Sequence, residues 1–137
     1  MVTTKLGIIG LSEGNGHPFS WSSIINGYSP ESLSTCGFPV IYDYMIANQH
    51  PNAGIRGAIV TSVFTQQRKL SEKIASCAKI PLIVNDVRKL VEKVDAVLLA
   101  RDDAENHVFY AKDTLSAGLP IFIDKPIALT IDRLDET

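Results

Sequence analysis

The stretch Leu115-Ser-Ala-Gly-Leu-Pro-Ile-Phe-Ile-Asp-Lys-Pro126 decides the fold of this 137-residue chain. Its glycine and first proline predict the end of a helix, because glycine readily takes the left-handed C-cap conformation and proline cannot continue a helix. The apolar run 121–123 then predicts a buried parallel strand. Asp124 and Lys125 stand at the carboxyl end of that strand, where open α/β sheets bind their ligands. Lys125 is therefore our first candidate for a functional residue.

Outward from this stretch, short apolar runs alternate with helical patterns along the whole chain. The predicted strands are 5–10, 56–64, 81–84, 95–100 and 121–123. The predicted helices are 19–26, a short one starting near 29–31, 40–49, 66–78, 87–92, 103–117 and one starting after Thr130. Because parallel neighbours need crossover connections, this alternation predicts an α/β fold with a doubly wound parallel sheet, a Rossmann-like three-layer α/β/α domain. The expected strand order is 3-2-1-4-5.

Composition excludes several classes of protein. The net charge is −2 and no cluster of Lys and Arg stands out, so we expect no nucleic-acid partner. No apolar run approaches the roughly 18 residues of a membrane span, and the first apolar stretch is too short for a signal peptide. Cys36 and Cys77 form no metal or redox motif. We expect free thiols, no metal site and a cytoplasmic protein.

The loop after the first strand contains glycine and polar positions that suit a phosphate. Glycines let the backbone approach a pyrophosphate, and the following helix N-terminus attracts its charge. Gly10 fits the first glycine of the G-x-G-x-x-G pattern, and Glu13 must point outward to avoid the phosphate. The candidate cofactor-binding residues here are Gly10, Ser12, Glu13, Gly14, Asn15 and Gly16. The alternative is a strand-to-helix turn that needs glycine only for its backbone angles.

The end of the second predicted strand lacks the acid that usually holds the adenosine ribose. Thr65 or Gln66 could bond a ribose hydroxyl instead, and Arg68 could bind a 2′-phosphate. The alternative is an ordinary helix start capped by Thr65. The choice between NAD and NADP therefore stays open.

Charged residues and a histidine follow the fourth predicted strand. Arg101 could bind a phosphate or a substrate carboxylate. Asp102 and Asp103 fit a helix cap better than catalysis. His107 falls in the first helical turn, either as a packing histidine or in the wall of a site.

Lys125 has the most direct chemistry of these candidates. Its ammonium group could bond a substrate hydroxyl or the nicotinamide ribose and help to move a proton, with Asp124 keeping it charged and oriented. The alternative is a surface ion pair of little energetic value. Trp21 suits packing, although its position near the glycine loop would also let it line a site.

Four segments, in order, resemble the N-terminal half of the Gfo/Idh/MocA oxidoreductases. They are Leu6–Gly10, Asp95–Ala100, Asn106-His107 with Ala111, and Ala117–Pro126. The resemblance implies a Rossmann domain that binds NAD(H) or NADP(H), with hydride transfer at a carbon of a sugar, inositol or similar polyol. It implies that Lys125 lies near nicotinamide and substrate, and it maps the family's histidine after the fourth strand onto His107.

The chain also departs from the family pattern. Arg101-Asp102 stands where the family usually has Thr-Pro, Asp124 where it often has Glu, and 28–54 resembles an insertion. We expect residues 1–126 to form the NAD(P)-binding domain and residues 127–137 to start a helix leading to a second, substrate-binding domain that this chain lacks. The chain alone would then bind cofactor and be a poor catalyst, and a homo-oligomer stays open.

Two functions fit these residues. The first is the cofactor-binding half of an NAD(P)-dependent oxidoreductase. The second is a non-catalytic Rossmann module with a degenerate nucleotide site, used for regulation or assembly. A phosphorylated signalling domain is set aside, because its Mg²⁺ site needs several acids after the first strand and only Glu13 stands there.

Overall fold

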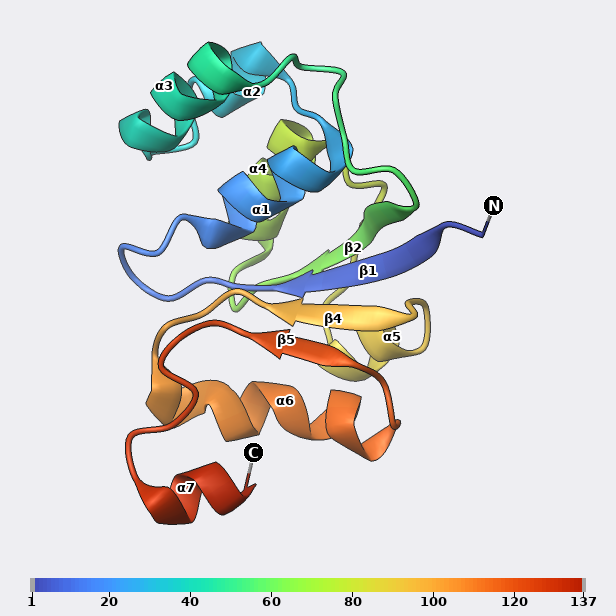
Figure 1. Cartoon of the computed structure of the whole chain (residues 1–137), viewed down its shortest axis with the longest axis vertical. Helices are drawn as coiled ribbons and strands as arrows, with labels where there is room; N and C mark the ends of the chain where they lie inside the picture. The colour runs from blue at the N-terminus through green and yellow to red at the C-terminus, as the bar shows by residue number, and fades with distance from the viewer. Residues whose placement is uncertain (1, 137) are drawn as a thin grey trace.

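A computed structural model of the chain describes residues 2–136, and within them five parallel strands form one sheet in the order β3-β2-β1-β4-β5 (Figure 1). The strands are β1 (Thr4–Ile9), β2 (Ala58–Phe64), β3 (Leu82–Ile83), β4 (Ala96–Leu99) and β5 (Ile121–Ile123). Every neighbouring pair is parallel. The predicted doubly wound Rossmann-like sheet and its strand order are confirmed.

Helices cover both faces of the sheet and make the other two layers (Figure 1). One face carries α1 (His17–Asn26) and α4 (Arg68–Ala78), and the other carries α5 (Val87–Val91) and α6 (His107–Ser116). The 3-10 turn η1 (Ala104–Asn106) precedes α6. The segment predicted to be an insertion forms α2 (Pro30–Leu33) and α3 (Pro39–Asn48), which pack outside α1 and α4, and α7 (Ile131–Glu136) lies beyond α6 (Figure 1).

The core has two halves, one on each face of the sheet. Ile8 packs with Phe19 of α1 in one cluster, while its neighbour Ile9 packs with Ala111 of α6 in the other. Both isoleucines are fully buried. Successive side chains of a strand point to opposite faces, so a sheet covered on both sides requires continuous apolar strands. That requirement explains why apolar residues dominate both faces of the predicted strands.

Two predicted helix caps are wrong. Thr65 does not cap α4, because its hydroxyl bonds Gln67 within the turn and Ser71 of the helix, and α4 begins at Arg68. Asp103 precedes η1 without a capping hydrogen bond. Its carboxylate pairs with Arg101 instead. In both cases a nearby side chain offers a better-placed partner than the helix backbone does.

Between residues 2 and 136 no helix is both long and apolar enough to cross a membrane. In the same range no group of three or more His, Cys, Asp or Glu side chains is placed to hold a metal ion.

Candidate functional site

The loop after β1 and the end of β5 meet at the carboxyl rim of the sheet (Figure 1). The amide Nδ2 of Asn15 donates to Oδ2 of Asp124 over 2.9 Å. Nδ1 of His17, the first residue of α1, lies 2.5 Å from the same oxygen. The two segments are 107 to 109 residues apart in sequence. The glycine loop and the Asp124-Lys125 pair therefore share one rim of the folded sheet.

Asp124 is the buried centre of this junction. Its side chain is 5% exposed, and its second oxygen, Oδ1, accepts the backbone N–H of Lys125 over 2.9 Å. Burial alone would raise the pKa of Asp124, but hydrogen bonds from Asn15, His17 and the Lys125 backbone outweigh it, and the pKa lies below its ordinary value. Asp124 is therefore an ionised carboxylate near neutral pH. It acts as the acceptor for three donors from the loop, α1 and its own strand end.

Lys125 itself is exposed, and its ammonium group has no hydrogen-bond or ion-pair partner within residues 2–136. The prediction that Asp124 holds this ammonium group is wrong, because the carboxylate is engaged by Asn15 and His17. The lysine side chain lines a groove of about 640 Å³ between the glycine loop, α1 and α3. It is a free cation at the edge of an open hollow.

The groove is lined by both polar and apolar side chains. Asn15, His17, Ser20, Asp102 and Lys125 supply most of the polar side chains. Trp21 and Ile24 from α1 and Phe38, Val40, Ile41 and Tyr44 from the insertion line the rest. The insertion therefore builds one wall of the groove, a role that its sequence did not indicate.

The glycine loop retains backbone donors for an anion. Among the described residues, the N–H groups of Ser12, Glu13, Gly14 and Gly16 have no hydrogen-bond partner in the protein. Gly14 has φ +75°, and a Cβ built on it would meet no atom within 4 Å. The loop therefore has both the donors and the room that a pyrophosphate needs. Glu13 is exposed, as that arrangement requires.

The start of α1 contributes fewer donors than in a typical phosphate-binding helix. The N–H of His17 is capped by Oδ1 of Asn15 over 2.9 Å, and Pro18 has no N–H. The N–H groups of Phe19 and Ser20 bond the carbonyl of Gly16. An anion would therefore be held by the loop backbone rather than by the first turn of the helix.

Ser12 explains how the loop tolerates a side chain at its second glycine position. Its hydroxyl donates to Oδ1 of Asp102 over 2.5 Å and accepts the backbone N–H of Asp102 over 3.0 Å. The side chain is therefore turned toward the end of β4 and buried there. It ties the loop to β4 and leaves the space above the loop open.

A second set of hydrogen bonds holds the first part of the loop. Gln66 accepts the N–H of Leu11 over 3.0 Å and donates to the carbonyl of Leu11 over 2.7 Å. Arg101 donates to the same carbonyl and to Gln66 Oε1 while pairing with Asp103 at 2.5 Å. Its guanidinium group also lies 4.3 Å from the ring centre of Tyr110. Arg101 is 6% exposed and has its donors engaged, so the structure gives it a scaffolding position.

The other predicted binding residues are spread around the rim. His107 is fully buried, with Nε2 2.6 Å from the carbonyl oxygen of Arg101 and Nδ1 3.1 Å from that of Ile127. Arg68 is exposed and bonds Glu72 and Asn85. Thr65 is buried in the turn after β2. The structure thus brings together the loop and Lys125, while Arg68, Thr65 and His107 stand apart with protein partners.

His17 is a groove residue that the sequence motifs did not single out. Its signal was present as a histidine directly after a glycine loop, with an acid at the end of the fifth strand. The ring stacks on Trp21, with centroids 4.7 Å apart and planes 15° from parallel. The contact between His17 and Asp124 was not predictable from spacing, because it depends on where the loop turns back over β5.

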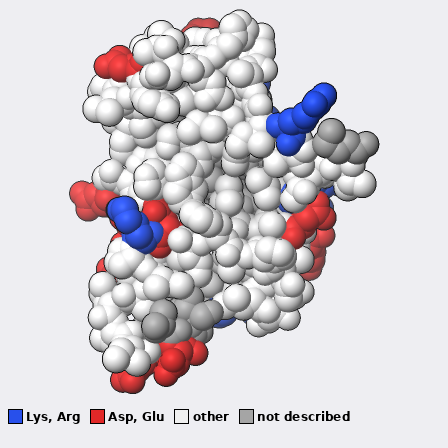
Figure 2. Space-filling model, in the orientation of Figure 1, with Lys and Arg blue, Asp and Glu red and all other residues white. Residues whose placement is uncertain are grey.

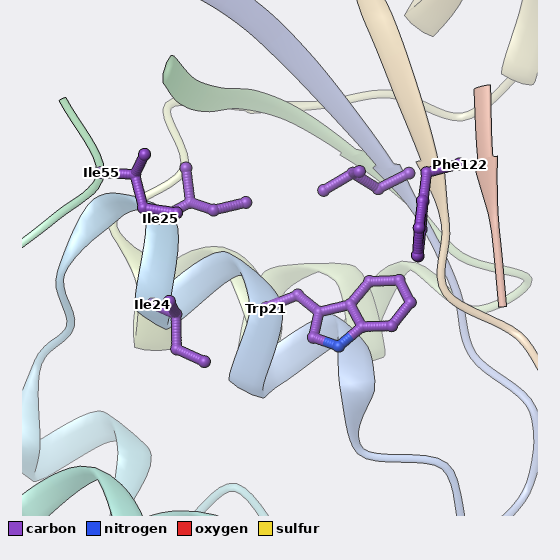
Figure 3. A pocket seen from close by; sticks show the side chains of 6 residues that line it. Trp21, Ile24, Ile25, Ile55 and Phe122 are labelled. Atoms are coloured by element: carbon purple, nitrogen blue, oxygen red, sulfur yellow. The ribbon is translucent and has the colours of Figure 1, made fainter. Parts of the chain in front are cut away.

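Trp21 also borders a second hollow, of about 310 Å³, beside the groove (Figure 3). Its indole meets the ring of Phe122 edge-on, with centroids 5.5 Å apart. Leu98 and the isoleucines Ile24, Ile25 and Ile55 complete the lining. On the face drawn in Figure 2, acidic and basic side chains are scattered and much of the middle carries neither. Trp21 itself lines both the groove and this apolar hollow.

Comparison with known proteins shows which family the chain belongs to. Residues 40–137, more than two thirds of the chain, match the Gfo/Idh/MocA family, described as an oxidoreductase family with an NAD-binding Rossmann fold. The match begins after the glycine loop, so the case for the loop depends on its geometry. No curated protein matches the chain.

Solved structures of several dehydrogenases share the fold. UDP-N-acetylglucosamine 3-dehydrogenase from Acidithiobacillus ferrooxidans is 19% identical, with a TM-score of 0.61 over 98% of this chain and 34% of that one. Scyllo-inositol dehydrogenase from Lactobacillus casei is 18% identical, with a TM-score of 0.64 over 98% of this chain and 32% of that one. Myo-inositol 2-dehydrogenase from Lactobacillus plantarum is 15% identical, with a TM-score of 0.63 over 98% of this chain and 31% of that one. The chain spans about a third of the length of these proteins.

Proposed function

The chain belongs to the Gfo/Idh/MocA oxidoreductase family, with its NAD-binding Rossmann fold, and from that premise we propose that it is the cofactor-binding part of a dehydrogenase acting on a sugar, inositol or similar polyol. The observation that carries the proposal is the junction of the glycine loop with the end of β5. Asn15 and His17 join the two through Asp124, which leaves Lys125 free beside the loop. A loop with unpaired backbone N–H groups and a free ammonium group thus share one rim, which supports the proposal.

A nicotinamide dinucleotide, NAD or NADP, would supply the hydride chemistry at this rim. The free N–H groups of Ser12, Glu13, Gly14 and Gly16 would hold its pyrophosphate. The ammonium group of Lys125 would donate to a ribose or substrate hydroxyl and so orient the carbon that gains or loses hydride. If the cofactor is NADP, the exposed side chain of Arg68 would bind its 2′-phosphate. To do so, Arg68 would have to give up its hydrogen bonds to Glu72 and Asn85.

The substrate class is suggested by the structural neighbours. They include dehydrogenases of inositols and of a nucleotide sugar, and the Lactobacillus casei scyllo-inositol dehydrogenase has been solved with NAD(H) and scyllo-inositol. The groove beside Lys125 pairs polar groups with apolar walls, which suits a ring that bears hydroxyl groups. We propose residues 1–126 as the cofactor domain and 127–137 as the lead into a substrate domain.

Titration of the purified chain with NADH and NADPH, followed by nicotinamide fluorescence, tests this function. We expect saturable binding that Lys125→Ala and Gly10→Val each weaken at least tenfold. Lys93→Ala is the matched control, because it removes an exposed lysine from the turn before β4, at the opposite rim. Absence of saturation with either cofactor at millimolar concentration, in a chain shown to be folded, would contradict the proposal.

The second candidate is a non-catalytic Rossmann module, and two observations favour it. Gln66 and Arg101 use the N–H and carbonyl of Leu11, and no acid ends β2 to hold a ribose. A chain that folds stably but binds neither cofactor would support this module.

A homo-oligomer also stays a proposal, to be checked by light scattering with size-exclusion chromatography.

A further inference from the structure

The groove contains a histidine–aspartate pair that the proposed function does not yet use. Nδ1 of His17 lies 2.5 Å from Oδ2 of Asp124, and the side chain of His17 is 39% exposed. The ring lines the same groove as the free ammonium group of Lys125. A half-exposed imidazole, fixed at one nitrogen by a buried carboxylate, has the arrangement that proton transfer requires.

The hydrogen bonds determine which ring nitrogen is free. Asp124 is ionised near neutral pH, so its Oδ2 accepts and Nδ1 of His17 must donate. In the neutral ring the lone pair then lies on Nε2. Asn15 donates to the same carboxylate oxygen and the Lys125 backbone donates to the other. Three hydrogen bonds, including the one from His17, therefore fix the position of the Asp124 carboxylate. The stack on Trp21 holds the ring plane.

We propose that His17 is a catalytic base of this site, with Asp124 as its positioning residue and a hydroxyl group of the polyol as its target. This inference rests on the proposed function. In the oxidation direction the hydroxyl O–H bond breaks and its proton passes to Nε2 of His17. The C–H bond on the carbon that bears this hydroxyl would break with its electron pair leaving as hydride, which a bound oxidised nicotinamide would accept as the carbonyl forms. Lys125 donates a hydrogen bond to the same oxygen and stabilises the charge that develops on it.

The charged groups around His17 suit this role. Asp124 faces Nδ1 from the end of β5, while Lys125 and Asp102 line the groove from the ends of β5 and β4. The carboxylate of Asp102 is engaged by the hydroxyl of Ser12. His17 therefore has a dedicated carboxylate partner, and Lys125 lies free to share the substrate oxygen.

Ring-nitrogen NMR of the three histidines tests the arrangement directly. We expect the neutral ring of His17 to carry its proton on Nδ1. His50 is the internal control, because its Nδ1 accepts the N–H of Asn52 over 3.2 Å and its proton must lie on Nε2. In Asp124→Asn the preference of His17 for Nδ1–H should fall. A proton on Nε2 of His17, or a tautomer population unchanged by Asp124→Asn, would overturn the proposal.

Cofactor and substrate provide the second test. Saturating NADH should shift the Nε2 resonance of His17 and leave that of His50 unchanged, and a bound cofactor that leaves His17 unshifted overturns the inference. Any turnover of scyllo-inositol or myo-inositol that the chain shows with NAD⁺ should fall about 10²-fold or more in His17→Gln, with the Kd for NADH within twofold and His50→Gln at the wild-type rate. Equal turnover by His17→Gln overturns the base.

The two proposals fail in different ways. If neither cyclitol is oxidised, the ring-nitrogen measurements decide alone. If NADH does not bind at all, the proposed function is wrong and the catalytic base falls with it, whatever the tautomer of His17. If NADH binds but the His17 tests fail, the dehydrogenase proposal stands without this base.

Discussion

The side-chain amide of Asn15 donates to the carboxylate of Asp124 over 2.9 Å and so links the first loop of the sheet to the end of its last strand. Both side chains are buried. A buried hydrogen bond to a charged group contributes about 1.5–3 kcal/mol, and it costs more to leave either partner unsatisfied. The bond therefore holds the glycine loop in a fixed relation to Lys125, which directly follows Asp124 in the chain.

Acid should destabilise the fold through the carboxylates of Asp103, which is partly buried, and Asp124, which is buried. Burial raises the pKa values of Asp103 and Asp124, but hydrogen bonds from Arg101 to the first, and from Asn15 and His17 to the second, leave both pKa values below the ordinary value of 3.8. A lowered folded-state pKa stabilises the protein above the unfolded-state pKa, and this stability is lost as the pH falls through the folded-state value. Urea unfolding should therefore show a falling free energy of unfolding below about pH 4.

The variants Asp103→Asn and Asp124→Asn should each make this fall shallower while lowering stability at pH 7. If the free energy of unfolding falls with pH as steeply in both variants as in the wild type, the protonation of neither carboxylate is linked to folding.

Arg101 should matter for stability rather than for binding phosphate. The side chains of Arg101 and Asp103 are 7% and 18% exposed, so Arg101→Met leaves a poorly solvated carboxylate and releases Leu11 and Gln66. We expect a loss of about 3 kcal/mol in the free energy of unfolding. The control Arg88→Met breaks a contact of 3.6 Å to Asp113, with the arginine 74% exposed, and should cost less than about 1 kcal/mol. Equal losses in the two variants would contradict the scaffolding role.

Gly14 should be needed for binding as well as for its backbone angle. Gly14 and Gly37 both have positive φ and open space around a built Cβ, so alanine should cost each about 1 kcal/mol of stability. Of the two glycines, only Gly14 lies in the loop that we propose to bind the pyrophosphate. Gly14→Ala should weaken NADH binding at least tenfold, while Gly37→Ala keeps the wild-type Kd. Parallel loss of binding in both variants would point to a general effect of destabilisation.

Cys77 should be inert in the folded protein. Burial, with a smaller contribution from Cys36, raises its pKa to about 12, and Lys73 lowers it only slightly. In a Cys36→Ser variant, a thiol reagent at pH 8 should label Cys77 only after unfolding in urea. Rapid labelling under native conditions would show that α4 opens more readily than its packing suggests.

The layered fold was predictable because it depends on local patterns. Apolar runs such as 95–100 and helix ends such as Gly118 are readable over a few residues, and parallel pairing with right-handed crossovers restricts the strand order. The sequence also predicts that the loop and Lys125 share a rim, since parallel strands end on one side of a sheet. It predicts the roles of particular side chains less well.

Side-chain partners depend on loops that the sequence does not place. Adjacency in sequence suggests that Asp124 pairs with Lys125, whereas its side-chain partners lie more than 100 residues away. Arg101 resembles a free cation in the sequence, because Leu11 and Gln66 come close to it only in the folded chain. The resemblance to a family pointed to His107, while the exposed histidine of the groove is His17.

The most direct test of the shared site is a backbone amide NMR titration with NADH. We predict that the amides of Gly14, Gly16 and Lys125 shift together and give one Kd, while the amides of Gly57 and Lys93, at the opposite rim, do not move. Shifts confined to the opposite rim, or a response of the loop without Lys125, would contradict the claim that the loop and the end of β5 form one cofactor site.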